Sequence, residues 1–327
     1  MPPFTAMTQS ASPAPAAVPP DAAAIRAAAA RIATRIRRTP LLRLSAADLG
    51  TPCDVTLKLE LLQASGSFKP RGAFNRMLSG PLPEAGVIAA SGGNHGAAVA
   101  YAARTLGVKA EIFVPEITGP AKLARIRSYG ATLVQGGASY DEARQACEAR
   151  AAETGALMVH AYDQPEVLAG QGTLALELEE QAPELTHVLV ATGGGGLIGG
   201  MAAWYGERAE VVSVEPEGCP TLYTALREGH PVPAPVGGLA ADSLGARQVG
   251  ALMFEVARQN IGNAVLVPDE AIRAAQQALW EACRIVAEPG GATALAALLC
   301  GAFVPPEGAV VGVVVCGGNT DPGSINA

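Results

Sequence analysis

Short apolar runs alternate with longer amphipathic segments along most of the chain. An apolar run bounded by turn residues predicts a strand, and apolar positions three or four apart predict a helix. In the first half we expect strands at 55–60, 87–91, 111–115, 132–135 and 157–160, and helices at 21–38, 94–105, 121–128 and 139–154. In the second half we expect an AGQGT turn at 169–173, a helix at 174–180, and strands at 187–192, 210–215, 263–268 and 310–316.

This alternation predicts an α/β fold with two doubly wound domains. The last strand is apolar throughout, as a parallel strand covered on both faces should be. We expect 21–81 and 164–327 to form a large domain, 82–163 a small one, and the Ala- and Pro-rich stretch 1–20 a disordered tail. Ligands of such folds bind at the carboxyl ends of the strands, so the site is expected in a cleft between the domains.

Composition excludes several classes of partner. The formal net charge is −7 and the sequence pI about 5.2, which disfavours nucleic acid and anionic membrane surfaces. No apolar run approaches the ~20 residues that a membrane-spanning helix needs. The six cysteines are scattered without a CxxC pair or a Cys/His cluster, which argues against a zinc site and a disulfide framework. We therefore expect a reducing, cytoplasmic location.

Four consecutive glycines, at 193–196, follow an expected strand and precede an apolar helix. Bare backbone N–H groups at a helix N-terminus form an anion cradle, for which phosphate is the natural ligand. The stretch also matches a dinucleotide fingerprint through Gly194, Gly196 and Gly199, with Glu215 placed to hold a ribose. Close packing of strand against helix, without any ligand, is the third interpretation. The glycine run alone leaves all three open.

A single lysine, Lys69, stands among small residues in the segment SGSFKPRGAFN, 65–75. An amine held partly away from water has a lowered pKa, so it can form an imine and later act as a base. Hydride transfer needs no such lysine. The alternative is an ordinary solvated lysine that opens a helix capped by Ser67.

Two further glycine-rich segments follow expected strands. In SGGNHG, 91–96, backbone donors suit a carboxylate and the Asn94 amide suits an aromatic oxygen, while a plain turn capped by Asn94 is the alternative. His95 is more typical of a packing residue than of a base. In CGGN, 316–319, Cys316 ends a buried strand, where a free cysteine usually behaves as a small apolar residue. Three such strand ends and one lysine together favour a site over unrelated structural features.

The order of these segments resembles the fold type II pyridoxal phosphate (PLP) enzymes, which include serine and threonine dehydratases, serine racemase and cysteine synthase. The likeness extends over residues 36–321 and rests on SGSFKPRGA, SGGNHG, AGQGT, GGGGLIGG, SVEPEG, AEPGGA and CGGN, in the family's order. It implies a fold similar to the tryptophan synthase β subunit, with the cofactor in the cleft between two α/β domains.

The resemblance also implies a role for each matching residue. Lys69 would carry the cofactor as a Schiff base, with Phe68 packed beside the ring. Asn94 would bind the ring 3′ oxygen, and Cys316 would face the pyridine nitrogen. The phosphate would be held by the backbone N–H groups of Gly193, Gly194, Gly195, Gly196 and Leu197. The substrate carboxylate would be surrounded by Ser91, Gly93, Asn94 and His95.

Some residues differ from those typical of particular family members, and these differences narrow the set of expected reactions. Serine racemase has a serine where this chain has Gly92, on the ring face opposite the lysine, so dehydration is favoured over racemisation. Cysteine synthases usually have threonine at the position of His95, which also favours a dehydratase. Glu215 matches a metal ligand of racemase-like members, but Thr221 replaces an accompanying carboxylate, so no metal is expected. Ser243 replaces a frequent glycine, and we expect it to affect side-chain selectivity.

The sequence thus predicts a PLP-dependent ammonia-lyase for a β-hydroxy L-amino acid such as threonine or serine, with threonine as first choice. A 3-hydroxyaspartate dehydratase, a phenylserine dehydratase and a serine racemase remain alternatives within the family, and Tyr162 is a candidate pocket residue. An NAD-dependent oxidoreductase and a catalytically silent binding protein remain alternatives outside it. Because the family commonly forms dimers, a homodimer is expected, with a small amino acid as the ligand partner.

Overall fold

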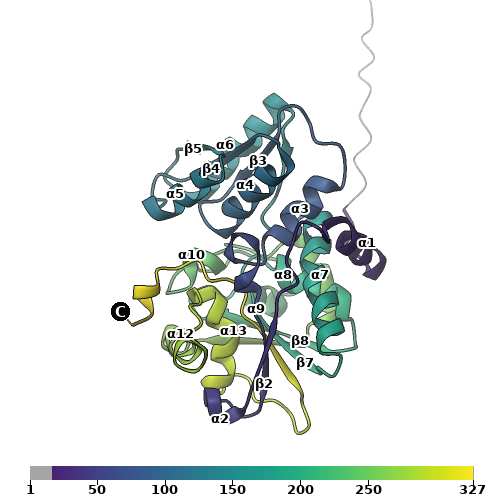
Figure 1. Cartoon of the computed structure of the whole chain (residues 1–327), viewed down its shortest axis with the longest axis vertical. Helices are drawn as coiled ribbons and strands as arrows, with labels where there is room; N and C mark the ends of the chain where they lie inside the picture. Colours follow the sequence, from purple (N-terminus) through teal and green to yellow (C-terminus); the bar gives the residue numbers. More distant parts are fainter. Residues whose placement is uncertain (1–16, 327) are drawn as a thin grey trace, which may run out of the picture.

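Two sheets organise the chain in this computed structural model, which describes residues 17–326 (Figure 1). The larger sheet has six strands in the order β1-β2-β10-β7-β8-β9, and the smaller has four in the order β5-β4-β3-β6. The predicted α/β class is therefore confirmed. Most of the predicted disordered tail, residues 1–16, lies outside the described residues.

The larger sheet contains β1 Leu41–Leu44, β2 Val55–Lys58, β7 His187–Ala191, β8 Glu210–Pro216, β9 Asn263–Val267 and β10 Val311–Val314. All its neighbouring strands are parallel except β1, which pairs antiparallel with β2. Every residue of β10 is buried, because this strand lies between β2 and β7 and is covered on both faces.

The smaller sheet contains β3 Val87–Ala90, β4 Ala110–Val114, β5 Thr132–Gln135 and β6 Leu157–Met158, and all its pairs are parallel. Together with the helices at 94–106, 120–128 and 140–154 it forms the upper lobe of Figure 1. All four strands fall within 82–163, the range expected for the small domain. The domain boundaries themselves remain a prediction.

The helices are α1 Ala22–Ile32, α2 Ala46–Leu49, α3 Pro70–Leu78, α4 Asn94–Leu106, α5 Pro120–Ser128, α6 Tyr140–Thr154, α7 Pro165–Gln181, α8 Gly196–Tyr205, α9 Thr221–Glu228, α10 Ala241–Leu244, α11 Ala251–Asn260, α12 Asp269–Cys283 and α13 Pro289–Leu299. Short 3-10 helices occupy Glu60–Leu62, Ala64–Gly66 and Pro322–Asn326. Within residues 17–326, no helix combines the length and apolarity that crossing a bilayer requires.

The AGQGT segment is not the predicted turn, because it lies inside α7. A Cβ at Gly170 would lie 2.5 Å from the Arg71 carbonyl oxygen, and one at Gly172 would lie 2.8 Å from that of Gly200. The missing side chains let α7 pack directly against the backbones of α3 and α8, which outweighs the low helix propensity of glycine. The prediction was wrong because this packing leaves no trace in the local pattern.

The N-terminal segment also differs from the prediction. Helix α1 ends at Ile32 rather than at Arg38, and the short strand β1 that follows was not expected. The backbone N–H of Arg37 donates to Oε1 of Gln63 at 2.8 Å instead of continuing the helix. A long-range hydrogen bond therefore ends the helical pattern early.

Four charged side chains are buried together where α3 meets α7 and β2; we call Lys58, Glu60, Arg71 and Glu177 the Arg71 network. Arg71 donates through Nε and Nη2 to both carboxylate oxygens of Glu60, at 2.8 and 2.7 Å, and through Nη2 to Glu177 at 2.9 Å. Lys58 donates to Glu177 at 2.5 Å. Since Arg71 follows Lys69 by two positions, this network anchors the start of α3 beside that lysine.

Candidate active site

Lys69 lies between the 3-10 turn Ala64–Gly66 and the first residue of α3. Its Nζ donates to the carbonyl oxygen of Ala161 at 2.8 Å and lies 5.1 Å from the centre of the Phe68 ring. The side chain is partly exposed, but protein atoms surround the amine. This burial lowers the pKa of Lys69 to about 8, although Cys316 and Glu288 act in the opposite direction. At neutral pH the amine is therefore uncharged more often than that of an ordinary lysine.

The chain has four lysines, and their surroundings separate Lys69 from the others. Lys58 belongs to the Arg71 network, and Lys122 pairs with Asp242 at 2.8 Å. Lys109 is exposed. Lys69 is thus the buried amine that no carboxylate holds in an ion pair, which is the state that imine formation requires.

The glycine loop, residues 193–196, joins β7 to α8. The backbone N–H groups of Gly193, Gly194 and Gly195 have no hydrogen-bond acceptor within residues 17–326. Gly195 adopts a φ of 88°, a conformation that favours glycine. Free donors at the N-terminus of a helix match the oxygens of a phosphate.

Close packing also requires glycine in this loop. A Cβ at Gly194 would lie 2.4 Å from a ring carbon of Tyr162, and one at Gly195 would lie 2.4 Å from Cε of Met253. The packing interpretation and the phosphate interpretation are therefore compatible. Tyr162 lies directly on the loop, and its place in the substrate pocket stays a prediction.

The Glu215 carboxylate accepts hydrogen bonds from the N-terminus of α9. Its Oε1 accepts from the backbone N–H of Leu222 at 2.7 Å, and its Oε2 accepts from that of Tyr223 at 2.7 Å. Burial raises the pKa of Glu215 to about 7. The Thr221 hydroxyl, also beside Glu215, lies 2.7 Å from the Gly193 carbonyl oxygen, so Glu215 supports the glycine loop through α9. These bonds argue against both a ribose and a metal as its ligand, and no metal-binding group of His, Cys, Asp or Glu occurs in the described part of the chain.

The SGGNHG turn starts helix α4, with Gly93 rather than Asn94 at the capping position. The Ser91 hydroxyl accepts from the Gly93 N–H at 3.2 Å. His95 is buried, and its Nε2 donates to the Val159 carbonyl oxygen at 2.8 Å. Burial, helped by the positive charge of Lys69, lowers the pKa of His95 to about 3. The ring is therefore neutral, and the predicted place of His95 near the substrate carboxylate stays a prediction.

Cys316 lies two residues after β10 and is 4% exposed. Its thiol donates to the Gly290 carbonyl oxygen at 3.4 Å. Burial and the charge of Glu288 raise the pKa of Cys316, so the thiol stays protonated. Its carbonyl oxygen accepts from the Phe68 N–H at 3.1 Å, and an isolated bridge pairs Ser67 with Gly317. The SGSFK and CGGN segments are thus direct neighbours.

Helix α10 connects the glycine-rich turns. A Cβ at Gly93 would lie 3.7 Å from the Asp242 carbonyl oxygen, and one at Gly193 would lie 2.7 Å from that of Leu244. A Cβ at Gly290 would lie 2.2 Å from the Ser243 hydroxyl oxygen. Ser243 therefore lies beside the segment that Cys316 contacts, and its effect on side-chain selectivity stays a prediction.

Three residues at the site had no predicted role. Glu288 and Asn319 both contact the Asn94 amide, each at 2.5 Å. Thr118 lies against Gly92, because a Cβ at that glycine would be 2.7 Å from the threonine methyl carbon. Glu288 and Asn319 belong to the AEPGGA and CGGN motifs, so the motif pattern pointed to them without indicating what they contact. Thr118 lies outside every motif and gave no signal.

The assembled residues fit PLP. The donors of the glycine loop are free for a phosphate, the Lys69 amine is buried without a carboxylate, and one proton of the Asn94 amide remains for a ring oxygen. A model of the PLP-dependent enzyme family matches residues 32–317 of this chain. The chain belongs to the fold type II PLP-dependent enzymes.

Within this family, the PLP enzyme is similar to proteins whose names state different reactions. An L-threonine ammonia-lyase from Geobacter sulfurreducens is 39% identical over 90% of this chain and 75% of the relative. A phenylserine dehydratase from Ralstonia pickettii is 36% identical over 92% of this chain and 94% of the relative. The solved structure of maize serine racemase superposes with a TM-score of 0.87 at 33% identity, over 93% and 95% of the two chains.

The glycine loop of this PLP enzyme provides a direct test of cofactor binding. In Gly194→Ala the new methyl group would displace the Tyr162 ring, and overpacking of this kind costs about 1–3 kcal/mol. We expect the dissociation constant for PLP to rise by about tenfold, measured by titrating the apoenzyme. Gly80→Ala is the control, because a Cβ there meets no atom within 4 Å. Unchanged PLP affinity in Gly194→Ala would contradict the assigned phosphate loop.

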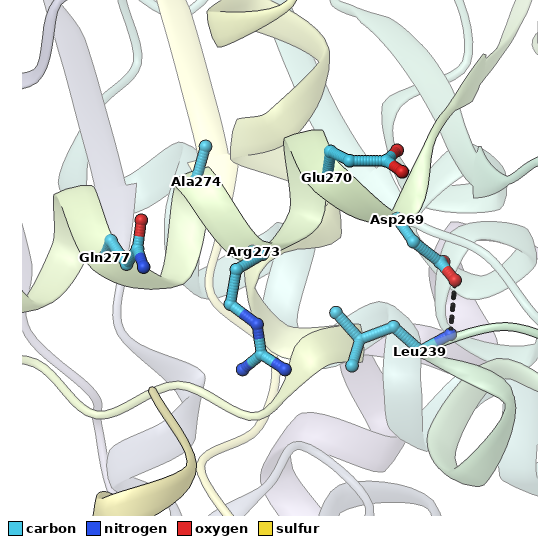
Figure 2. A pocket seen from close by; sticks show the side chains of 6 residues that line it. All are labelled: Leu239, Asp269, Glu270, Arg273, Ala274 and Gln277. Atoms are coloured by element: carbon cyan, nitrogen blue, oxygen red, sulfur yellow. Dashed lines mark hydrogen bonds between the residues drawn. The ribbon is translucent and has the colours of Figure 1, made fainter. Parts of the chain in front are cut away.

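A concave surface lies beside helix α12 of this enzyme. It has a volume of about 450 Å³ and is lined by Leu239, Asp269, Glu270, Arg273, Ala274 and Gln277, mostly on α12 (Figure 2). Asp269 accepts from the Leu239 N–H at 2.8 Å, and Arg273 donates to the Ser324 carbonyl oxygen at 2.6 Å. It contains none of the predicted site residues, and internal hydrogen bonds already engage these two charged side chains.

Proposed function

We propose that this enzyme releases ammonia and water from a β-hydroxy L-amino acid, with threonine preferred over serine. The observation that carries the proposal is the buried Lys69 amine, which pairs with no carboxylate and donates to Ala161, next to the Tyr162 that packs on the glycine loop. The 39% identity to an L-threonine ammonia-lyase supports threonine as substrate. A cytoplasmic location and a homodimeric assembly are part of the same proposal.

PLP, when bound, supplies an aldehyde for an imine and a conjugated ring that accepts electron density. The Lys69 amine, whose pKa burial lowers so that an uncharged fraction exists at neutral pH, removes the proton from the substrate α-carbon. Backbone donors of residues 193–197 would hold the phosphate, and Ser91 with the first turn of α4 would hold the substrate carboxylate. The neutral Cys316 thiol is a poor proton source for a ring nitrogen. This favours elimination, in which the departing hydroxyl removes the developing charge.

A keto-acid release assay across threonine, serine, 3-hydroxyaspartate and phenylserine tests the proposal. We expect the highest kcat/KM with threonine and a lower value with serine. A value about tenfold higher for phenylserine or 3-hydroxyaspartate than for threonine would reassign the substrate. Absence of keto acid with all four compounds would contradict the lyase itself.

The balance between elimination and racemisation gives a second test. The Thr118 side chain fills the space beside Gly92, with its methyl carbon and hydroxyl oxygen 2.7 and 2.8 Å from an added Cβ. Gly92→Ser alone is therefore strained, whereas Gly92→Ser combined with Thr118→Ala has room for the new hydroxyl. Because a positioned acid contributes about 100-fold or more to a proton transfer, we expect D-serine formation from L-serine to rise markedly in the double variant.

Chiral chromatography of D-serine, with pyruvate measured in parallel, provides the readout. Thr118→Ala alone is the control and should leave the ratio of D-serine to pyruvate unchanged. Substantial D-serine formation by the parental enzyme would show that Gly92 does not prevent racemisation.

A further inference from the structure

Glu288 lies just before α13, with its carboxylate turned toward the start of α4. The residue is 7% exposed, and its Oε1 accepts from Nδ2 of Asn94 at 2.5 Å. The backbone makes room for this contact, because a Cβ at Gly317 would lie 1.9 Å from the same carboxylate oxygen. The segment that follows β10 therefore leaves room for an acidic side chain next to Asn94.

Asn319 binds the oxygen of the Asn94 amide. Its Nδ2 donates to Oδ1 of Asn94 at 2.5 Å and to the Ser65 carbonyl oxygen at 2.9 Å. Turning the Asn94 amide over would set its oxygen against the Glu288 carboxylate and its nitrogen against that of Asn319. Both contacts would be repulsive, so these two neighbours fix the orientation of Asn94. An amide nitrogen has two protons, and the one not bound to Glu288 remains for a ligand.

Charged and titratable groups surround Glu288 on several sides. Burial raises the pKa of Glu288 to about 7, although the Asn94 amide and the charges of Arg125 and Lys122 lower it. The Glu288 charge in turn raises the pKa of both Lys69 and Cys316. Above neutral pH the carboxylate form prevails, and a carboxylate is a stronger acceptor for the Asn94 N–H than a neutral acid.

We propose that Glu288, together with Asn319, is a positioning residue that turns the Asn94 amide so that its free N–H faces the 3′ oxygen of the cofactor ring. The inference rests on the roles proposed for Lys69 and Asn94. Glu288 acts through Asn94 and does not itself bind the cofactor. Its contribution to cofactor affinity therefore exists only while both Asn94 and the ring oxygen are present.

Cofactor binding without chemistry tests this inference. The probe is pyridoxine 5′-phosphate, which retains the ring oxygen but has no aldehyde to react with Lys69, titrated into apoenzyme at about pH 8 where the carboxylate prevails. Loss of a buried hydrogen-bond partner predicts an affinity about tenfold lower in Glu288→Ala and in Asn94→Ala. The double variant should lie within about threefold of Asn94→Ala, because residues that act as one unit are not additive.

Two further comparisons separate positioning from a general structural effect. Glu288→Gln keeps an acceptor for Asn94 and should bind the probe within about threefold of the parental protein. The 3-deoxy analogue of the probe lacks the ring oxygen, so Glu288→Ala should bind it as well as the parental protein does. Thr293→Val, on the helix α13 that begins directly after Glu288, removes a hydroxyl that donates to the Pro289 carbonyl oxygen and should leave affinity unchanged.

The outcomes are decisive in both directions. The inference would be overturned if the double variant lost affinity by the product of the two single losses. It would also be overturned if Glu288→Ala lost as much affinity for the 3-deoxy analogue as for pyridoxine 5′-phosphate. If Glu288→Ala does not fold, a loss of affinity in Glu288→Gln as large as in Asn94→Ala would overturn it, and retained affinity would support it. Because no substrate is used, a parental enzyme that binds PLP but releases no keto acid would refute the proposed function without deciding this inference.

Discussion

Replacement of Lys69 by alanine is expected to slow keto-acid release from threonine by about 10³-fold or more, because the variant lacks both the imine-forming amine and the base. Burial, which lowers the pKa of Lys69 to about 8, is what lets this amine perform both tasks at neutral pH. Steady-state assays of the purified variant, with PLP present in excess, provide the measurement.

Two observations make this expectation specific. Borohydride treatment of the parental enzyme should bleach the visible absorption and add the cofactor mass to the peptide that contains Lys69. Lys109→Ala is the matched control, because Lys109 is exposed and should leave the rate unchanged. Parental turnover in Lys69→Ala, or cofactor mass on a different lysine, would refute the assignment of the imine to this residue.

Replacement of Arg71 by methionine is expected to give the largest loss of stability. The substitution leaves Glu60 and Glu177 buried with only the charge of Lys58 nearby, and breaking a buried ion pair in this way costs about 3–5 kcal/mol. Denaturant unfolding of the apoenzyme, followed by circular dichroism, measures the effect. We also expect weaker PLP binding, since α3 begins directly after Lys69.

An exposed ion pair provides the comparison for the Arg71 network. Arg38 pairs with Glu180 at 2.8 Å, but the two side chains are 56% and 54% exposed. Exposed pairs contribute about 0–1 kcal/mol, so Arg38→Met should shift the unfolding midpoint little. A similar midpoint for both variants would show that the buried network does not stabilise the fold as proposed.

Sequence patterns predicted the parts of this enzyme that are local in the chain. The apolar strands, the glycine loop and the position of Lys69 each follow from a short run of residues, and the order of the motifs indicated the family. The AGQGT segment was misassigned because the reason for its glycines lies in helices α3 and α8, far away in sequence. Tertiary packing overrides local propensity in such places.

The contacts of Asn94 show a second limit of local reasoning. Glu288 lies 194 positions from Asn94, and Asn319 lies 225 positions away. Each belongs to a recognisable motif, but a single sequence does not indicate which motif residues meet in space.

The stretch between β6 and α7 ties Lys69 to the arrangement of the two lobes. Lys69 donates to Ala161, His95 donates to Val159, and Asp163 accepts from the first backbone N–H groups of α11 at 3.0 Å. This short strap, residues 159–163, thus forms hydrogen bonds with α4 in the upper lobe, with α11 and with the Lys69 amine. Because Val159 and Asp163 are each held by hydrogen bonds on either side of Ala161, the position of the acceptor for the Lys69 amine depends on both ends of this strap.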